Sequence, residues 1–460
     1  ARASQWMEEN IPLFECSQKN FEEMYYYRWW TLRKHIKETP VGYGMTEFLV
    51  NRSYADKYNL IACAIGHHIY ESRWLRNPEY LNQIIHTWYR GNEGGPMAKM
   101  TKFSSWNADA VLGRYMVDGN KEFLLDMVKD LEAEYARWEK TNRLPNGLYW
   151  QGDVQDGMEE SISGGRRKQY ARPTINSYMY GNAKALSLIG IMTGDEGMAM
   201  KYGLKADSIK TLVQDKLWNT DHHFFETMRG DASAEVREAI GYIPWYFNLP
   251  DASSKYTVAW KEVMDEKGFS APYGLTTAER RHPEFRTHGV GKCEWDGAIW
   301  PFASAQTLTA MANFMNNYPQ TVLTDSVYFH QMERYVESQH HRGRPYIGEY
   351  LDEVTGYWLK GDQERSRYYN HSTFNDLMIT GLIGLRPRMD NTVEVNPLIP
   401  EGKWDYFCLD NVLYHGRNLT ILWDKDGSRY QRGKGLHIYV DGKEVGHADT
   451  LTRVLCENVL

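Results

Sequence analysis

Two acidic loops, nearly two hundred residues apart, carry side chains that could exchange protons with a substrate. Their acidic residues are Asp153, Asp156, Glu159 and Glu160 within residues 151–164, and Glu349, Asp352 and Glu353 within residues 344–356. Cleavage of a glycosidic bond needs one carboxylic acid and one carboxylate on opposite sides of the bond. A fold that brings the two loops face to face would supply both groups.

The chain has 460 residues and a formal net charge of -7, with Lys and Arg interspersed among the acidic residues. That length can bury a substantial core, so we expect a globular protein. The charge pattern contains no basic stripe, which argues against nucleic acid and anionic membranes as partners. No apolar run approaches the ~20 residues that span a bilayer, and we expect no membrane insertion.

Aromatic residues are abundant, with 16 Trp, 32 Tyr and 15 Phe. Trp and Tyr combine flat apolar faces with a polar tip, which suits the C–H faces and hydroxyl edges of sugar rings. A carbohydrate substrate is therefore one interpretation of this composition. A large helical core that uses aromatic side chains for packing is the other.

Cysteines and histidines give no metal signature in the sequence. The five cysteines are scattered and include no CxxC pair, so we expect free buried thiols. The adjacent pairs His67-His68, His222-His223 and His340-His341 point to different faces of a helix and have no carboxylate partner at ligand spacing. We predict no catalytic metal, and no phosphate-binding loop indicates a cofactor; a structural cation stays open.

The N-terminal sequence, residues 1–6, lacks the charged and then apolar pattern of a signal peptide. Two localisations follow: secreted or periplasmic if a leader has been removed, and cytoplasmic otherwise. The sequence does not decide between them, and it does not give the oligomeric state.

The elements that must position the two loops are mainly helical from Phe14 to about Leu385. The predicted helices cover residues 58–70, 78–89, 105–117, 121–138, 177–192, 196–217, 303–315 and 326–339. Several form pairs in which an apolar helix precedes a more charged one across a short turn. An apolar helix is buried on two sides and a charged one exposes a face, so the alternation suggests concentric rings of helices.

After Arg386-Pro387 the pattern changes to short β-type runs separated by turn residues. The runs are residues 392–395, 419–423 and 436–440, the last followed by Asp441-Gly442. We therefore predict two domains, a helical catalytic domain at residues 1–388 and a small C-terminal β domain at residues 389–460.

A third motif, Trp295-Asp-Gly-Ala-Ile-Trp300-Pro301, lies between the two loops and precedes a predicted helix. It resembles the Trp-Arg-Gly-Pro-Ile-Trp-Pro motif of family 63 glycoside hydrolases, which include processing α-glucosidase I and the mannosylglycerate hydrolases. The segments at residues 157–161 and 347–352 resemble that family's general-acid and general-base segments, in the same order. Residues 361–385 and the β tail look closer to mannosylglycerate-hydrolase-like proteins.

The resemblance implies an (α/α)6 toroid of the six-hairpin type and an inverting hydrolase with Glu159 as general acid and Glu349 as general base. The chain departs from the family in its first loop. Glu159 stands where the family has Asp, and Glu160 stands where it has Asn. Asp156 is therefore kept as the alternative acid, while Asp352 and Glu353 fit a solvated turn.

Further candidates for substrate binding come from the loops and helix starts near these motifs. They are Trp106, Asp109, Asp153, Arg172, Asn176, Trp295, Trp300 and His371. For each of them a purely structural role is an equal alternative. The run at residues 171–178 leads into a helix, for which Pro173, Asn176 and Ser177 are possible start signals.

The function predicted from these observations is cleavage of a terminal glycosidic bond by a Glu/Glu pair. An α-L-rhamnosidase-like toroid hydrolase that uses other loop acids is one alternative. A carbohydrate-binding relative without catalytic activity is a second alternative. Sugar identity and linkage stay open.

Overall fold

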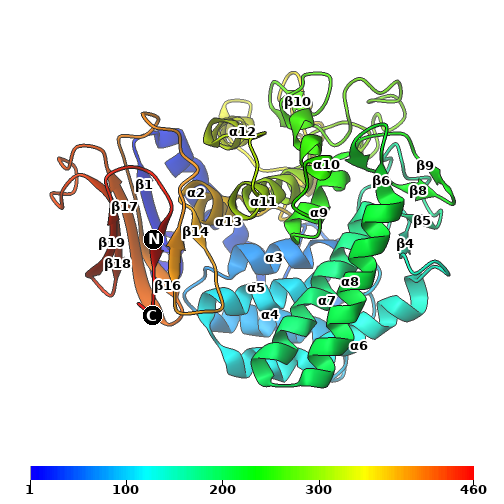
Figure 1. Ribbon diagram of the computed structural model, residues 1–460, viewed down its shortest axis with the longest axis horizontal. Helices are drawn as coiled ribbons and strands as arrows, with labels where there is room; N and C mark the ends of the chain where they lie inside the picture. Colours follow the sequence, from blue (N-terminus) through cyan, green and yellow to red (C-terminus); the bar gives the residue numbers. More distant parts are fainter. Residues whose placement is uncertain (1) are drawn as a thin grey trace.

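The computed structural model describes residues 2–460 and is mainly helical up to about residue 385 (Figure 1). Its helices are α1 (Arg2–Asn10), α2 (Lys19–Arg33), α3 (Ile65–Ser72), α4 (Pro78–Arg90), α5 (Asn107–Asp118), α6 (Lys121–Asn142), α7 (Pro173–Thr193), α8 (Glu196–Leu212), α9 (Ile243–Tyr246), α10 (Ser254–Thr257), α11 (Pro301–Asn317), α12 (Asp325–Ser338) and α13 (Phe374–Leu377). None of these combines the length and apolar character that crossing a bilayer requires.

Seven of the eight predicted helices are confirmed as α4 to α8, α11 and α12, with ends shifted by a few residues. The prediction for residues 58–70 is only half right. Tyr58 and Asn59 have positive φ values of 61° and 60°, a backbone conformation that no α-helix contains, so the helix α3 begins at Ile65. The predicted helix at 196–217 ends as α-helix at Leu212 and continues as one π-turn.

In the hairpins α5–α6 and α7–α8, one turn residue ends the first helix and the next residue begins the second. Gly119 and Gly194 adopt the left-handed conformation, with φ of 68° and 74°, and end the first helix of each pair. Asn120 and Asp195 follow directly, and their side chains accept backbone N–H groups of α6 and α8. The chain therefore reverses within three residues, and α7 and α8 lie side by side (Figure 1).

Burial differs between the two helices of each pair, as the sequence pattern predicts. Most of α7 is buried all round, whereas α8 buries only Met198, Tyr202, Ala206 and Ile209. The same contrast separates α11 from α12. The more buried helices contact each other in the order α3, α5, α7, α9, α11 and α13, and α13 also contacts α3.

Two antiparallel sheets occupy the C-terminal region, seen at one end of the molecule in Figure 1. Five strands form the larger sheet in the order β1 (Leu13–Cys16), β16 (Tyr406–Tyr414), β17 (Arg417–Asp424), β18 (Gly435–Val440) and β19 (Lys443–Ala448). The smaller sheet contains β14 (Leu385–Arg386), β15 (Val393–Val395) and β20 (Val454–Cys456). Because β1 pairs with β16, the N-terminal segment contributes an edge strand to this region. The domain boundary at residue 389 stays a prediction.

Short strand pairs at the ends of the helices carry the loops of interest. They are β2 (Ile36–Thr39) with β3 (Gly42–Met45), β4 (Trp150–Gln151) with β5 (Tyr170–Ala171) and β8 (Met228–Arg229) with β9 (Ala232–Ser233), β6 (Trp218–Asn219) with β7 (Phe224–Phe225), β10 (Ser270–Ala271) with β11 (Gly274–Leu275), and β12 (His340–His341) with β13 (Arg344–Pro345). The first acidic loop connects β4 to β5, and the second begins at β13.

Candidate active site

Glu159 lies on the compact loop between β4 and β5, close to the helical core. Gly157, two residues before it, has φ of 71°, and a Cβ there would lie 3.4 Å from the Cβ of Cys63. Gly164 leaves room for Asp153, whose carboxylate oxygen would lie 2.3 Å from an added Cβ. These glycines are therefore needed for a turn that packs against the segment before α3 and directs Glu159 inward.

Asp156 anchors this loop to the start of α7 and is surrounded by donors. Its carboxylate accepts hydrogen bonds from Arg172 Nε at 2.7 Å, Thr174 Oγ1 at 2.5 Å and Ser104 Oγ at 2.5 Å. The Asp156 and Arg172 side chains are both completely buried. Both oxygens of Asp156 are thus occupied by donors, and Asp156 is not among the residues that line the cavity of Glu159. The geometry thus favours Glu159 over Asp156 as the acid.

Glu349 lies on the second loop, which is tied to the core by a β-bridge between Leu351 and Ile299. Its side chain is 4% exposed, and its Oε1 makes no hydrogen bond within residues 2–460. Two cations approach the carboxylate: Arg365 Nη2 lies 3.6 Å from Oε1, and Lys360 Nζ lies 4.0 Å from Oε2. Burial raises the pKa of Glu349, while Lys360 and Arg365 oppose that rise.

The two glutamates line one cavity, although 190 residues separate them in the sequence. Its wall is otherwise rich in aromatic side chains: Phe48, Tyr54, Phe103, Trp300, Phe302 and Tyr369. Burial raises the pKa of Glu159 to about 7, with additional contributions from the charges of Asp153 and Glu349. Of these two glutamates, Glu159 has no ion pair among the described residues, whereas Glu349 lies beside two cations.

A third carboxyl in this cavity, that of Glu47, was not among the residues singled out in the sequence. Glu47 follows β3 and is 2% exposed. Its two carboxyl oxygens lie 3.4 and 3.5 Å from Cys63 Sγ, a weak hydrogen-bond donor. Burial raises the pKa of Glu47 to about 8, so this carboxyl is mainly protonated at neutral pH. The segment Thr46-Glu47-Phe48 matches no catalytic motif, and only the tertiary structure reveals it.

The Trp295–Pro301 motif forms an aromatic stack beside the cavity. Trp300 stacks on Trp295 and on Tyr350, with ring centroids 4.6 Å apart in both cases. Trp300 itself lines the cavity, and Pro301 begins α11 as the sequence predicts. The indole N–H groups of Trp295 and Trp300 are buried without a hydrogen-bond partner in the described part of the chain. The motif thus places the Trp300 ring at the cavity, supported by Trp295 from the same motif and by Tyr350 from the second acidic loop.

His371 also lines the cavity, in edge contact with Tyr369 at 3.9 Å between ring centroids. Its Nε2 is buried and has no partner among residues 2–460. Burial holds the pKa of His371 well below its usual range, so the ring is neutral. A neutral imidazole nitrogen can accept or donate one hydrogen bond to a bound hydroxyl.

The other candidate binding residues lie outside this cavity. Trp106 is fully buried and donates to Tyr246 Oη at 3.0 Å. Asn176 bonds the backbone N–H and C=O of Tyr149, each at 2.8 Å, and Arg172 pairs with Asp156. These side chains hold elements together. Asp109 faces a separate cavity.

The remaining loop acids have distinct surroundings. Asp153 is buried beside the Glu159 loop, and its Oδ1 has no partner in the described residues. Glu160 pairs with Arg166. Asp352 accepts backbone N–H groups of Val354 and Thr355 in a turn. The sequence expectation of a solvated turn is wrong for Glu353, which is 8% exposed and pairs with Arg286 because its side chain points back into the fold.

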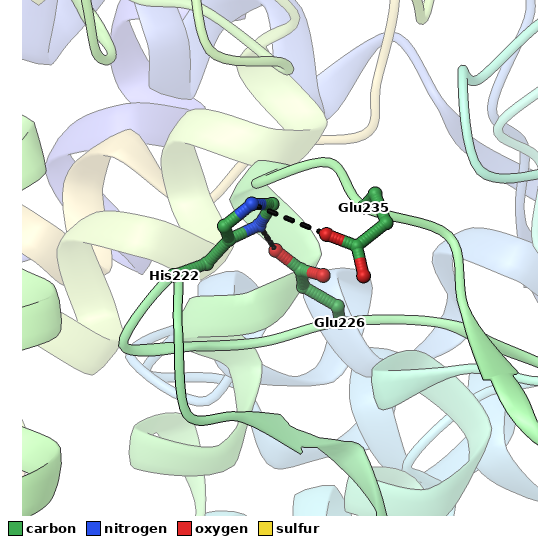
Figure 2. Close-up of side chains that lie close together, drawn as sticks. All are labelled: His222, Glu226 and Glu235. Carbon is green, nitrogen blue, oxygen red and sulfur yellow. Dashed lines mark hydrogen bonds and ion pairs between the residues drawn. The ribbon is translucent and has the colours of Figure 1, made fainter.

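His222 does have carboxylate neighbours, contrary to the expectation from sequence spacing (Figure 2). Its Nδ1 lies 2.5 Å from Glu226 Oε1, and its Nε2 lies 3.2 Å from Glu235 Oε2. Glu226 is four residues along the chain from His222. Glu235 comes from beyond β9, and its proximity to His222 is not evident from the spacing in the sequence. Both ring nitrogens face carboxylate oxygens, so one imidazole and two carboxylates form a compact cluster at the protein surface.

Comparison with known proteins agrees with this geometry. Residues 57–372 match the model of the mannosylglycerate hydrolase MGH1-like glycoside hydrolase domain, and these residues include Glu159 and Glu349. The chain belongs to this family of glycoside hydrolases. Residues 385–447 match the C-terminal domain of glycosyl hydrolase family 65.

Solved structures extend the comparison. A protein named "Sialidase" is 84% identical with a TM-score of 0.99, and the match covers all of this chain but 42% of that one. The chain thus spans less than half the length of that relative. A GH63 mannosylglycerate hydrolase from Thermus thermophilus, in complex with Tris and D-glycerate, is 12% identical over 77% of this chain and 98% of the other, with a TM-score of 0.56. A GH78 rhamnosidase of Bacillus sp. GL1 is 13% identical over 94% of this chain and 42% of the other, with a TM-score of 0.60. At these identities the last two comparisons establish a shared fold.

Proposed function

We propose that the chain is an (α/α)6 toroid that hydrolyses a terminal glycosidic bond with inversion, using Glu159 as general acid and Glu349 as general base. The observation that carries the proposal is that both glutamates, from two distant loops, line one aromatic cavity. The cyclic contacts of α3, α5, α7, α9, α11 and α13 support a closed inner ring. Outer helices that expose a charged face fit the second ring of such a toroid.

The reaction assigns a different task to each carboxyl. Glu159 donates its proton to the glycosidic oxygen as the bond from that oxygen to the anomeric carbon breaks. A water molecule forms the new bond to the anomeric carbon from the opposite face, and Glu349 accepts its proton. The raised pKa of Glu159 keeps its proton available near neutral pH. Lys360 and Arg365 favour the ionised form of Glu349.

The rest of the cavity suits a carbohydrate ring. Trp300, supported by Trp295 and Tyr350, offers an apolar face for ring C–H groups. Glu47 and His371 offer polar atoms that have no strong partner within the described chain. A buried polar group without a strong partner is costly, and a sugar hydroxyl would satisfy it. We therefore assign Glu47 and His371 to hydroxyl recognition.

The test is a panel of aryl glycosides and oligosaccharides that includes α-glucosides, mannosides, arabinosides, rhamnosides and sialosides. Sugar release by the native chain that is lost in Glu349→Gln and Glu159→Gln supports the proposal. Glu364→Gln, an exposed acid near the second loop, is the matched control and should keep full activity. Proton NMR of the first-formed anomer then tests inversion, and a product that retains the substrate's configuration would refute it.

Two alternatives have their own outcomes in the same panel. The shared fold with the GH78 rhamnosidase, over 94% of this chain, favours including α-L-rhamnosides as a second candidate substrate class. Rhamnoside cleavage that survives both Gln substitutions would indicate other loop acids. Saturable sugar binding without turnover of any substrate would instead indicate a carbohydrate-binding relative.

A further inference from the structure

A second cavity, of about 640 Å³, lies among the buried helices and shares no lining residue with the cavity of Glu159 and Glu349. Its lining residues come from α5, α7 and α11 and from the segment around β14. These elements are labelled in Figure 1. Trp106 lies between the two cavities: it donates to Tyr246, which lines the second cavity, and makes edge contact with Phe302, which lines the first. The volume of the second cavity is in the range of small-molecule sites.

The charge of this cavity is its most informative property. Five cationic and three acidic side chains line it, although the whole chain has a net charge of -7. Three of the cations are already paired: Arg73 with Asp376 at 2.8 Å, Lys210 with Asp251 at 2.8 Å and Arg388 with Asp390 at 2.7 Å. The positive excess therefore comes from the other two.

Arg386 and Lys184 are these two cations, and neither has a carboxylate within 4 Å anywhere in residues 2–460. Arg386 donates only to neutral acceptors, the Asn313 Oδ1 at 2.7 Å and the Thr380 carbonyl at 3.0 Å. Burial lowers the pKa of Arg386 despite the nearby charge of Glu394. Arg386 is only partly buried and lines the cavity, so an anion bound there could form charge-assisted hydrogen bonds with a guanidinium that no carboxylate pairs.

The neutral part of the lining fits hydroxyl groups and sugar rings. Tyr180, Tyr246 and Phe247 contribute aromatic surface. Asp109 accepts a single side-chain hydrogen bond, from Tyr70 Oη at 2.6 Å, which leaves its other carboxyl oxygen for a ligand hydroxyl. Asp109, a candidate substrate-binding residue from its sequence context, lines this second cavity.

From the unpaired cations Arg386 and Lys184, the hydroxyl acceptor Asp109 and the aromatic wall, we infer that this cavity binds a small hydroxylated anion, a sugar acid or a sugar phosphate. The anionic group lies against Arg386 and Lys184, and the ring contacts the tyrosines. This second site is separate from the proposed reaction and does not depend on it.

Isothermal titration calorimetry of the full chain tests the inference with D-glucuronate, D-glucose 6-phosphate, D-glucose and inorganic phosphate. We expect saturable binding of one of the two sugar anions. D-glucose should bind more weakly by roughly tenfold because it lacks the charge-assisted hydrogen bonds, and inorganic phosphate by a similar factor because it lacks the ring contacts. The sugar anion with the lower Kd shows whether the cavity prefers a carboxylate or a phosphate group. No binding of either would overturn the inference.

Variants locate the ligand. Arg386→Gln and Lys184→Gln should each weaken binding by roughly tenfold, and Lys184 lies on an exposed position of α7 where the substitution leaves the fold intact. Lys216→Gln, an exposed lysine outside the cavity, and Glu349→Gln should bind as the native chain does. Unchanged affinity in Lys184→Gln, or loss of binding in Glu349→Gln, would overturn the assignment to this cavity.

Discussion

Arg172 and Asp156 form an ion pair of 2.7 Å in which neither side chain is exposed to solvent. The pair joins the loop of Glu159 to the first residues of α7, because Arg172 directly precedes Pro173. Ser163 also accepts from Arg172 Nη1, at 3.1 Å. The position of the proposed acid thus depends on a contact between a loop and a helix start.

Breaking this ion pair should destabilise the fold as well as lower activity. In Asp156→Asn a buried guanidinium loses its counter-ion, which costs about 3–5 kcal/mol in buried pairs. Urea denaturation measures the change in the free energy of unfolding. The control Asp362→Asn breaks the exposed pair with Arg342 and should leave stability nearly unchanged. Equal urea concentrations at the unfolding midpoint for the two variants would contradict the structural role of Asp156.

Substrates with different leaving groups should separate the acid from the base. Glu159→Gln removes proton donation, which contributes roughly 10²–10⁴-fold, so cleavage of oligosaccharides should fall by that factor. An aryl glycoside with a highly acidic phenol needs little protonation and should be cleaved at a rate closer to that of the native chain. Glu349→Gln should fail with both substrates, because water activation is lost. The same loss for both substrates in Glu159→Gln would refute its role as acid.

The helical part of the fold was largely predictable from local sequence, because it depends on local signals. Gly194 followed by Asp195 ends one helix and begins the next, and both tasks are properties of the residue types. Tyr58 was misassigned because apolar spacing does not report a positive φ. The edge strand β1 was missed for a different reason: its partner β16 lies almost four hundred residues away in the sequence.

The site was predictable only where a motif exists. Trp300 was found through its motif and lies at the cavity, whereas Glu47 has no motif and lies there too. Trp106 and Asp109 are neighbours at the start of α5, yet Trp106 is in the core and Asp109 lines the second cavity. Trp106 precedes the first helical residue of α5 and has non-helical backbone angles, so it does not share a helix face with Asp109 despite the spacing of three residues. The surroundings of each side chain then depend on which helices pack around α5.

Substitutions at Glu47 should distinguish hydroxyl recognition from catalysis. Glu47→Gln keeps a hydrogen-bond donor and an acceptor of similar size, so it should retain most of the native kcat/KM. Glu47→Leu removes both and should lower kcat/KM by roughly tenfold to a hundredfold. Steady-state kinetics on the best substrate of the panel measures both. A Glu47→Gln variant as inactive as Glu349→Gln would show that Glu47 exchanges protons in the reaction.

Activity should fall as the pH rises through about 7, because Glu159 must be protonated to act as the acid. Burial raises its pKa from an ordinary 4.5 to about 7, so its proton is held in the neutral range. We expect a pH profile of kcat/KM with an alkaline limb near pH 7 on oligosaccharides. With an aryl glycoside that needs no protonation, this limb should weaken. If kcat/KM falls in the same way with pH for both substrates, the titrating group is not Glu159.

The same pKa shift links stability to pH. Because folding raises the pKa of Glu159, the folded state keeps a proton that the unfolded state loses between pH 4.5 and about 7. This contribution to the free energy of unfolding is complete below pH 4.5 and is lost as the pH rises through the folded pKa. Glu159→Gln cannot ionise, so the variant should gain stability relative to the native chain at about pH 8 but not at about pH 4. Thermal unfolding at the two pH values measures the difference, with Glu364→Gln as the exposed control. A stability difference independent of pH would show that Glu159 ionises in the folded state as it does in water.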